Sequence, residues 1–287
     1  MNNSVVQVSI LIPTFNSAAT LTACLKSLVG QTQQNFEVLV LDGGSSDGTV
    51  EIARAQLARL ARTELVCEPD LGIYDAINKG IRRARGEWIY VLGSDDALHD
   101  PGVMAAVAAQ LGPQANLFYG KVYRRSINAI VGKALAADDL YAVNICQQAI
   151  FYRRSLFGRL GEFRLEYPLC ADWAFNIACF AQAHPPVFMD LVVADYAGDG
   201  RSATTVDERF YADRLRLIAS AHSALYTSAV FRRARYLFLE HARWQWTRQQ
   251  HSTSLRNYLL FAYHSVALRL FGVAEDGAGW LGSRHIQ

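Results

Sequence analysis

Two adjacent carboxylates, Asp95 and Asp96, follow a short apolar run and a Gly-Ser pair. Adjacent negative charges at the end of a buried strand repel each other, and a bound divalent cation offsets that repulsion. Oxygen ligands suit Mg²⁺ or Mn²⁺, and such a cation stabilises charge on phosphate oxygens. The alternative is an acidic pair on a solvated turn before a helix. The pair therefore indicates either a metal site that serves a phosphate-bearing substrate or a charged turn without chemistry.

A second polar segment, residues 42–49, reads Asp-Gly-Gly-Ser-Ser-Asp-Gly-Thr. Its glycines let a ligand approach the backbone closely, and its hydroxyls and carboxylates select polar groups on that ligand. Because a carboxylate repels phosphate, Asp42 is better suited to a base or a ribose. The glycine spacing matches neither the dinucleotide fingerprint nor the P-loop. The alternative is a strand-to-helix turn capped by Asp47 or Thr49.

A third candidate is Asp172, a lone acid between Ala171 and Trp173. Small apolar and aromatic neighbours partly desolvate a carboxylate, and desolvation makes it a stronger base. The residue could equally be a helix N-cap, whose side chain accepts a hydrogen bond from the backbone. The sequence therefore predicts a general base or a cap at this position.

The elements that must position these residues alternate regularly over the first hundred residues. Apolar, β-branched runs predict buried strands, and helical periodicity predicts helices between them. The predicted strands are Val8–Ile12, Phe36–Leu41, Glu64–Cys67 and Trp88–Leu92. The predicted helices are one capped by Asn16 or Ser17, then Thr49–Leu60, Ile73–Ala84 and an Ala-rich one opened by Asp100-Pro101. This order predicts an α/β protein with a doubly wound, mostly parallel sheet, whose ligands bind beyond the carboxyl ends of the strands.

The pattern is looser after residue 115. Residues 116–123 and 149–152 are predicted strands, residues 172–183 a helix, and residues 187–196 a late strand. Residues 205–272 favour two or three helices rich in arginine and aromatic side chains. We therefore expect a main domain over residues 1–204 and a basic helical extension over residues 205–287.

Composition supports a folded protein with uneven charge. Hydrophobic residues make up 51% of the 287 residues and charged residues 19%, which excludes a disordered or collagen-like chain. The net charge of +2 is too small to indicate nucleic acid as a partner. Residues 1–200 carry 16 Lys and Arg against 20 Asp and Glu, whereas residues 201–287 carry 12 against 6. The five cysteines lack zinc-knuckle spacing, and no secretory leader is recognisable, so we expect a cytoplasmic protein.

Four sequence blocks follow one another in a fixed order. They are Ile-Pro-Thr-Phe-Asn (12–16), Asp-Gly-Gly-Ser-Ser-Asp-Gly-Thr (42–49), Asp-Leu-Gly-Ile-Tyr-Asp-Ala-Ile-Asn-Lys-Gly (70–80) and Gly-Glu-Trp-Ile-Tyr-Val-Leu-Gly-Ser-Asp-Asp (86–96). Together they resemble the family 2 glycosyltransferases, in particular bacterial enzymes of exopolysaccharide and O-antigen synthesis, including the colanic-acid type. The likeness covers about residues 7–200.

The resemblance implies a GT-A fold and an inverting transfer of a sugar from a nucleotide-diphospho sugar to a hydroxyl of a glycan or a lipid-linked acceptor. UDP is the commoner nucleotide in such enzymes, and GDP or dTDP are alternatives. Asp172 would be the general base, and Asp96 would bind Mn²⁺ or Mg²⁺. The remaining matched positions would contact the donor: Pro13, Thr14, Asn16, Asp42 at the base, Asp70 on the nucleotide side, and Asp95 at ribose or sugar.

Three further short segments, around residues 77–78, 147–148 and 201, depart from the family pattern or allow alternative interpretations. Ile77 stands where many members have arginine, which leaves Asn78 as either a nucleotide contact or a surface helix residue. Gln147 replaces a frequent histidine, and Gln148 is a candidate contact to donor or acceptor. Arg201, in a glycine-rich stretch, would face the diphosphate or lie in a solvated loop.

Several alternatives concern the extension and the activity. The extension could bind anionic lipid at the inner face of the plasma membrane, pack on the main domain, or form a homodimer surface. A sugar nucleotidyltransferase would need a glycine-rich, basic first loop, which Pro-Thr-Phe-Asn at 13–16 does not provide. A non-catalytic sugar-nucleotide-binding or assembly protein is the other alternative, and the joint presence of Asp42, Asp95, Asp96 and Asp172 argues against it.

Overall fold

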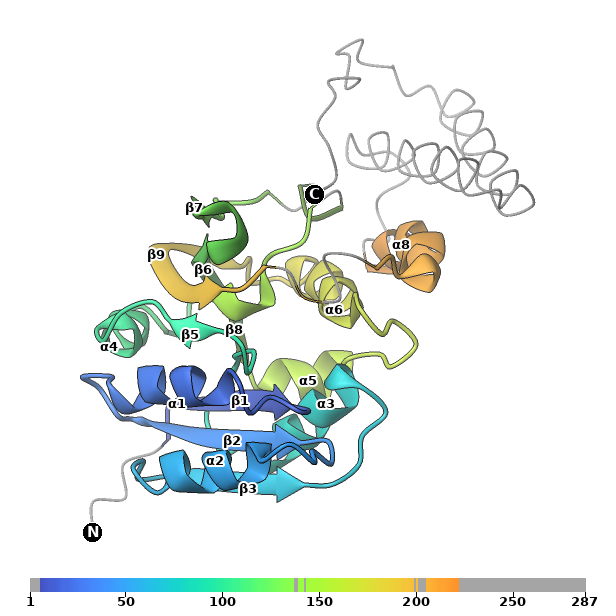
Figure 1. Ribbon diagram of the computed structural model, residues 1–287. Coiled ribbons are helices and arrows are strands. Elements are labelled where there is room, and N and C mark those ends of the chain that lie inside the picture. Colours follow the sequence, from blue (N-terminus) through green and yellow to red (C-terminus); the bar gives the residue numbers. More distant parts are fainter. Residues whose placement is uncertain (1–5, 137–138, 142, 199, 201–204, 222–287) are drawn as a thin grey trace, which may run out of the picture.

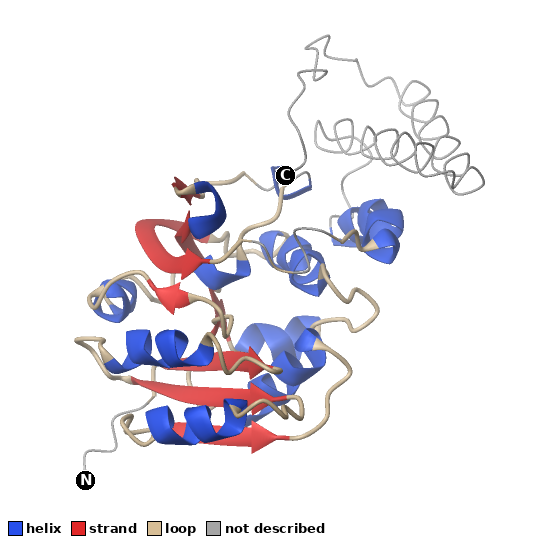
Figure 2. Ribbon diagram, viewed as in Figure 1, coloured by secondary structure: helices blue, strands red, loops and turns tan. Residues whose placement is uncertain are grey.

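The protein is built around one mixed β-sheet with helices on both faces (Figure 1, Figure 2). In the computed structural model the described residues are 6–136, 139–141, 143–198, 200 and 205–221. Within them the strand order is β3-β2-β1-β4-β8-β6-β9-β5, and β7 pairs with β6. The strands are β1 (Val8–Thr14), β2 (Phe36–Asp42), β3 (Thr63–Cys67), β4 (Trp88–Val91), β5 (Ala97–Leu98), β6 (Leu117–Arg124), β7 (Ala129–Val131), β8 (Ile150–Arg153) and β9 (Val187–Tyr196).

The helices fill the connections between these strands. The α-helices are α1 (Leu21–Val29), α2 (Thr49–Leu57), α3 (Ile73–Arg83), α4 (Val103–Ala108), α5 (Ser155–Leu160), α6 (Ala171–Phe180) and α8 (Glu208–Ala221). Short 3₁₀ turns occupy η1 (Arg125–Ile127), η2 (Asp139–Tyr141) and η3 (Gln147–Ala149).

The predicted α/β class and the parallel arrangement of the first four strands are confirmed. Strand β1 pairs in parallel with both β2 and β4, and β2 pairs in parallel with β3. The later half of the sheet is mixed, because β8 runs antiparallel to β4 and to β6.

Alternate side chains of the strands pack into two separate hydrophobic cores, one on each face of the sheet. In β1, Val8, Ile10 and Ile12 pack with α1, α2 and α4 on one face of the sheet. On the other face, Leu11 packs with α3 and α6. Because successive strand residues point to opposite faces, a strand buried on both faces is apolar almost throughout. This is why the sequence shows continuous apolar runs there.

Two helices begin later than the sequence predicts. Helix α1 starts at Leu21, because the Ser17 carbonyl already accepts the N–H groups of Thr20 and Leu21 in a preceding turn. Neither Asn16 nor Ser17 is its cap. Helix α4 starts at Val103, so Pro101 lies in the turn before it rather than in its first turn.

Helix α8, the first part of the predicted extension, packs against α6 (Figure 1). Phe210, Leu217 and Ile218 are buried in the same core as α6. The guanidinium of Arg214 lies 4.7 Å from the ring centre of Tyr211. Packing on the main domain is therefore the arrangement of residues 205–221, and residues 222–287 lie outside the described residues. No helix in the described part is long and apolar enough to cross a membrane.

One buried carboxylate, Asp207, ties α8 to the segment that precedes α6. Its Oδ2 accepts the N–H groups of Leu169 at 3.0 Å and Cys170 at 3.1 Å, and its Oδ1 accepts that of Phe210 at 3.1 Å. Replacing Asp207 by alanine leaves buried donors without a partner and removes a helix cap. We expect a loss of about 3 kcal/mol in the free energy of unfolding, measured by urea denaturation. Arg216→Gln, on the same helix with a side chain 74% exposed, is the control and should change it by less than about 0.5 kcal/mol.

Candidate active site

The predicted ligand edge of the sheet is the one where β1, β2 and β4 end. Strands β1 and β4 are neighbours in the sheet. Helix α1, which follows β1, packs on one face of the sheet, whereas α3, which precedes β4, packs on the opposite face. The connections of these two strands therefore lie on opposite faces. Ligands of open α/β sheets bind at such a point. The loops after the two strands meet there, since the hydroxyl oxygens of Ser17 and Ser94 are 2.9 Å apart.

The loop after β1 is locked to the loop after β2. The N–H of Asn16 donates to Ser45 Oγ at 2.8 Å, and Asn16 Oδ1 accepts the N–H of Ser46 at 3.0 Å. Asn16 has a φ of 49°, a left-handed conformation that asparagine tolerates. Pro13 and Thr14 are the buried last residues of β1, so the exposed residues of this sequence block are Phe15 and Asn16.

Asp42 and Asp70 come together at the ends of β2 and β3. Asp42 is buried, and its Oδ2 accepts the N–H groups of Gly44 and Ser45 at 3.0 Å each. A Cβ on Gly43 would lie 2.3 Å from Asp70 Oδ2, so only glycine lets the Asp70 carboxylate approach the backbone here. Both carboxylates line a small hollow with Lys79, whose Nζ donates to the Pro69 carbonyl.

The interpretation of residues 42–49 as a strand-to-helix turn describes Asp47 well, but Gly48, not Asp47 or Thr49, occupies the cap position of α2. Asp47 Oδ1 accepts the N–H of Thr49 at 3.1 Å, and its Oδ2 accepts the N–H of Ala18 at 3.0 Å. A hydrogen bond from the Thr49 hydroxyl to Oδ1, at 2.5 Å, is the main cause that lowers the pKa of the Asp47 carboxyl, and these backbone hydrogen bonds add to it. Asp47 therefore shapes the loop, while Asp42 lies at the hollow.

Asp95 and Asp96 differ sharply in environment. Asp95 is exposed, and its carbonyl accepts a hydrogen bond from the Arg125 guanidinium. Asp96 is 2% exposed; its Oδ1 accepts the N–H of Ala197 at 2.8 Å, whereas its Oδ2 is buried without a hydrogen-bond partner among the described residues. Burial, and then the Asp95 charge, raises the pKa of Asp96 to about 7. A buried oxygen without a donor is the ligand that a cation would complete.

This raised pKa makes the stability of the ligand-free protein depend on pH. Between the ordinary pKa of 3.8 and about 7, folded Asp96 holds a proton that the unfolded chain has released. Stability therefore falls as the pH rises through that window, by up to about 4 kcal/mol. We expect urea denaturation of the wild-type protein without added metal to give a lower free energy of unfolding at pH 7.5 than at pH 5.

Asp96→Asn should remove most of this pH dependence, because the amide does not titrate. Burial also raises the pKa of Asp172. Wild type and Asp96→Asn therefore both retain the part of the pH dependence of stability that Asp172 contributes. Equal pH dependence in Asp96→Asn and wild type would contradict the assignment to Asp96.

Asp172 is the second residue of α6 and is 6% exposed. Cys170, not Asp172, occupies the cap position, so the cap alternative is wrong. The Tyr74 hydroxyl donates to Oδ1 at 2.7 Å, and Asn144 Nδ2 donates to Oδ2 at 2.9 Å. Burial raises the pKa of Asp172, and these two hydrogen bonds partly oppose the rise. The result is an oriented, desolvated carboxylate, as a general base requires.

The two buried carboxylates border a common region. Burial raises the pKa of the Cys146 thiol, and the charges of both Asp96 and Asp172 raise it further, so the thiol lies near both carboxylates. Gln148 also belongs to this region: its side chain lowers the pKa of Asp96, and its Oε1 accepts the Cys146 thiol at 3.0 Å. The structure thus brings together Asp96, Asp172 and Gln148 from distant parts of the chain.

One predicted site residue, Asn78, is not part of this arrangement. Asn78 is buried; its Nδ2 donates to the Phe163 carbonyl at 2.8 Å, and its Oδ1 accepts the Phe163 N–H at 3.0 Å. The prediction of Asn78 as a surface helix residue is therefore wrong. Its side-chain amide is also engaged by these two hydrogen bonds, so it does not face a nucleotide. Arg201 lies outside the described residues.

The two donors to Asp172, Tyr74 and Asn144, are not among the site residues predicted from the sequence. Tyr74 belongs to one of the resembling blocks, and its place beside Asp75 in that block was the signal available. Asn144 is 28 positions from Asp172 in a segment without a motif, so only the fold reveals it.

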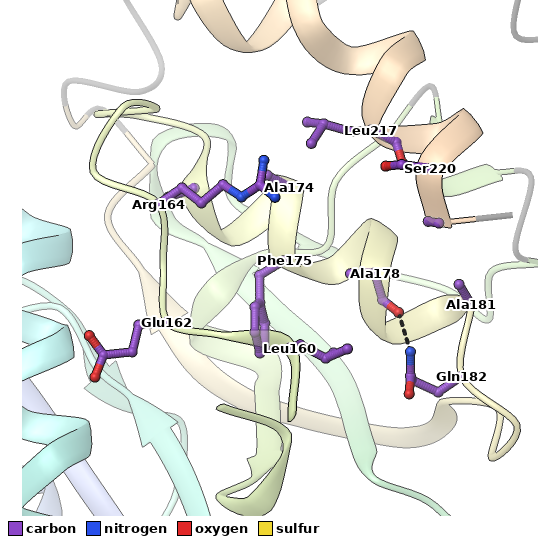
Figure 3. A pocket seen from close by; sticks show the side chains of 12 residues that line it. Leu160, Glu162, Arg164, Ala174, Phe175, Ala178, Ala181, Gln182, Leu217 and Ser220 are labelled. Atoms are coloured by element: carbon purple, nitrogen blue, oxygen red, sulfur yellow. Dashed lines mark hydrogen bonds between the residues drawn. The ribbon is translucent and has the colours of Figure 1, made fainter. Parts of the chain in front are cut away.

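A separate cavity of about 280 Å³ lies between α6, α8 and the segment after α5 (Figure 3). Ala174 and Ala178 line it from α6, Ala181 lines it just after that helix, and Leu217 and Ser220 line it from α8. Neither Asp96 nor Asp172 lines it. The cavity therefore does not belong to the carboxylate site.

Comparison with known proteins identifies the family that this sequence matches. The model of the family "Glycosyl transferase family 2" matches residues 9–160. A "PGL/p-HBAD biosynthesis glycosyltransferase" of Mycobacterium bovis is 43% identical over 212 residues, which cover 72% of this chain and 83% of the relative. "Glycosyltransferase AglE" of Haloferax volcanii is 34% identical over 125 residues, which cover 42% of this chain and 41% of the relative.

Solved structures show the same fold at low sequence identity. S. aureus TarS 1–349 in complex with UDP-GlcNAc aligns with a TM-score of 0.64 at 20% identity, covering 80% of this chain and 70% of TarS 1–349. The mannosyltransferase PcManGT of Pyrobaculum calidifontis, in complex with GDP-Man and Mn²⁺, aligns with a TM-score of 0.57 at 17% identity, covering 92% and 86%. The fold is thus the GT-A fold that the motifs imply. From the family match and the mycobacterial relative together, the chain belongs to glycosyl transferase family 2.

Proposed function

We propose that this glycosyltransferase moves a sugar from a nucleotide-diphospho sugar, in the first place a UDP-sugar, to a hydroxyl of a glycan or a lipid-linked acceptor. The observation that carries the proposal is the pair of buried carboxylates at one edge of the sheet. Asp172 is held by two donors, and Asp96 offers an oxygen without a partner. Cell-surface polysaccharide synthesis is the role we propose, and the biosynthetic glycosyltransferase among the relatives supports it.

The proposed reaction is a single displacement with inversion at the anomeric carbon. The acceptor hydroxyl gives its proton to Asp172 as its oxygen attacks that carbon, and the bond to the nucleotide diphosphate breaks on the opposite side. A desolvated carboxylate with a raised pKa is matched to this proton transfer. Because the acceptor is itself the nucleophile, the reaction needs no covalent intermediate on the protein.

A divalent cation, Mn²⁺ or Mg²⁺, fits the residues present. Asp96 Oδ2 is buried without a partner, and the Asp95 charge adds to the negative potential there. The described residues hold no group of three or more His, Cys, Asp or Glu suited to a metal. One or two carboxylates suffice where substrate phosphates supply the other ligands. When bound, the cation would stabilise negative charge on the diphosphate. The Mn²⁺ complex of PcManGT supports this proposal.

The donor would lie along the ends of β1, β2 and β3. We propose that Asn16, Asp42 and Asp70 contact the nucleotide, and that Asp95 and Gln148 lie toward the sugar. Pro13 and Thr14 would support the site from within β1. The hollow beside Asp42, and the nucleotide sugars in the two structural neighbours, support this arrangement.

A donor panel tests the function. UDP-, GDP- and dTDP-sugars are incubated with Mn²⁺, and nucleotide-diphosphate release is measured with and without candidate acceptors. Acceptor-dependent release of one nucleotide diphosphate supports the transferase. Binding without turnover on any acceptor would favour the non-catalytic binding protein. Release of pyrophosphate from a nucleoside triphosphate and a sugar phosphate would favour the nucleotidyltransferase.

Membrane association and a homodimer remain proposals for the extension. Cosedimentation with anionic liposomes, comparing the full chain with a truncation, tests the first, and sedimentation velocity tests the second. The truncation should follow Ala221, because a cut near residue 205 would remove α8 and expose the core that Phe210 and Ile218 fill. Equal liposome binding by both proteins would contradict a membrane anchor beyond residue 221.

A further inference from the structure

Three uncharged side chains link the interior of the protein to the Asp172 carboxylate. The Tyr152 hydroxyl on β8 donates to Asn176 Oδ1 at 2.8 Å, and Asn176 Nδ2 donates to Asn144 Oδ1 at 3.0 Å. Asn144 Nδ2 then donates to Asp172 Oδ2 at 2.9 Å. The three hydrogen bonds therefore form one chain in which every donor points toward Asp172.

The direction of this chain is fixed at both ends. A carbonyl oxygen only accepts, so the Tyr152 hydroxyl must be the donor to Asn176. The Asn144 oxygen also accepts the N–H of Ile145 at 2.9 Å, which turns its amide nitrogen toward Asp172. Flipping either asparagine would bring two oxygens face to face in the interior. Tyr152 and Asn176 are fully buried, so no solvent can compensate for a flip of Asn176.

We propose that Asn144, held by Asn176 and Tyr152, is a positioning residue that keeps the buried Asp172 carboxylate ionised and oriented toward the acceptor. The proposal rests on the proposed function, in which Asp172 is the general base. Tyr74 is the second donor to the carboxylate: its single hydroxyl proton is directed at Asp172 Oδ1 at 2.7 Å, while the Leu169 carbonyl oxygen lies farther away, 3.2 Å from the hydroxyl oxygen. With one donor on each oxygen, a lone pair remains on the carboxylate for the acceptor proton.

The surroundings leave hydrogen bonding as the main force that opposes desolvation. The titratable groups whose pKa the Asp172 charge raises are Tyr74 on α3, Tyr152 on β8, Cys146 before η3 and Cys170 before α6. All four are neutral at neutral pH, since burial raises each pKa further. The side chains of Tyr74 and Asn144 lower the pKa of Asp172 against the effect of burial. Removing Asn144 should therefore shift the base toward its protonated form.

The test is the pH profile of kcat/KM for Asn144→Ala. We expect the midpoint of the acidic limb to move up by about one to two pH units, with the donor KM changed less than about twofold. Asn144→Asp keeps the side-chain size and should move the midpoint further in the same direction, because it adds a like charge. If Asn144→Ala does not fold, Asn144→Asp carries the test.

Two tyrosines provide a matched comparison. Tyr152→Phe should move the same midpoint up by a few tenths of a pH unit, since it removes only the outer donor and its polarising effect. Tyr167→Phe is the control. Tyr167 is equally buried, but its hydroxyl donates to Asp213, which is not part of this chain of hydrogen bonds. We expect Tyr167→Phe to leave the midpoint unchanged.

A measurement independent of turnover separates this inference from the proposed function. Carboxyl-¹³C aspartate labelling and NMR titration, with Asp172→Asn for assignment, give the pKa of Asp172 directly. An upward shift in Asn144→Ala supports the network even if no acceptor is turned over. An unchanged pKa would overturn the inference while leaving the glycosyltransferase assignment intact. Full activity of Asp172→Asn would instead overturn the role of Asp172 as the base.

Discussion

Asp172→Asn should lower kcat by about 10³-fold, because the variant has no group that can take the acceptor proton. The fold should survive, since an amide has nearly the shape of a carboxylate. The Tyr74 hydroxyl can turn to accept a hydrogen bond from it. The free energy of unfolding should change little, because two effects oppose each other. The variant no longer buries a charge, which stabilises it, but it also loses hydrogen bonds to the carboxylate, which destabilises it. Steady-state kinetics with saturating donor and acceptor measure the effect.

Donor binding separates a catalytic defect from a structural one. Isothermal titration calorimetry with the nucleotide diphosphate and Mn²⁺ should give an affinity for Asp172→Asn within about twofold of wild type, because Asp172 is assigned to the acceptor side. Asp190→Asn, which neutralises a side chain 79% exposed, is the control for charge and should retain full activity. A loss of less than tenfold in kcat for Asp172→Asn would show that another group is the base.

Asp96→Asn should produce the second large effect, a loss of about 10²–10⁴-fold in kcat/KM at a fixed Mn²⁺ concentration. The variant lacks the buried anionic oxygen that would bind the cation, so the Mn²⁺ concentration for half-maximal activity should rise strongly. The same substitution should stabilise the metal-free protein at pH 7.5, because it removes a buried charge. Activity and stability are thus expected to move in opposite directions.

The neighbouring acid gives the sharpest comparison for Asp96. Asp95→Asn removes an equal charge from an exposed position next in sequence, and its effect on the Mn²⁺ requirement should be much smaller. Manganese titrations of nucleotide-diphosphate release, carried out on both variants, measure this difference. Equal sensitivity of the two variants would mean that both carboxylates bind the metal. Full activity of both variants after treatment with EDTA would contradict a metal requirement.

The fold could be predicted largely from local pattern. The runs at Val8–Thr14 and Phe36–Asp42 are apolar because those strands are buried on both faces, and this burial itself predicts a parallel sheet with helices on each side. The polar residues that end these strands then mark the ligand edge. The start of α1 escaped prediction because a turn at Ser17 uses the backbone groups that a cap would need. The reversed direction of β8 escaped it because strand pairing depends on distant partners.

The sequence by itself determined which carboxylates are available for chemistry. Local order places Asp42, Asp95 and Asp96 after buried strands, and it places Asp172 between a small residue and an aromatic one. Only the tertiary structure decided which carboxylates are desolvated and which donors hold them. Asp95 and Asp96 are neighbours in sequence, yet one is exposed and the other has a pKa of about 7. Asn144 reaches Asp172 from 28 positions away. The physical reason is that desolvation and hydrogen bonding depend on what packs around a group, and those partners are distant along the chain.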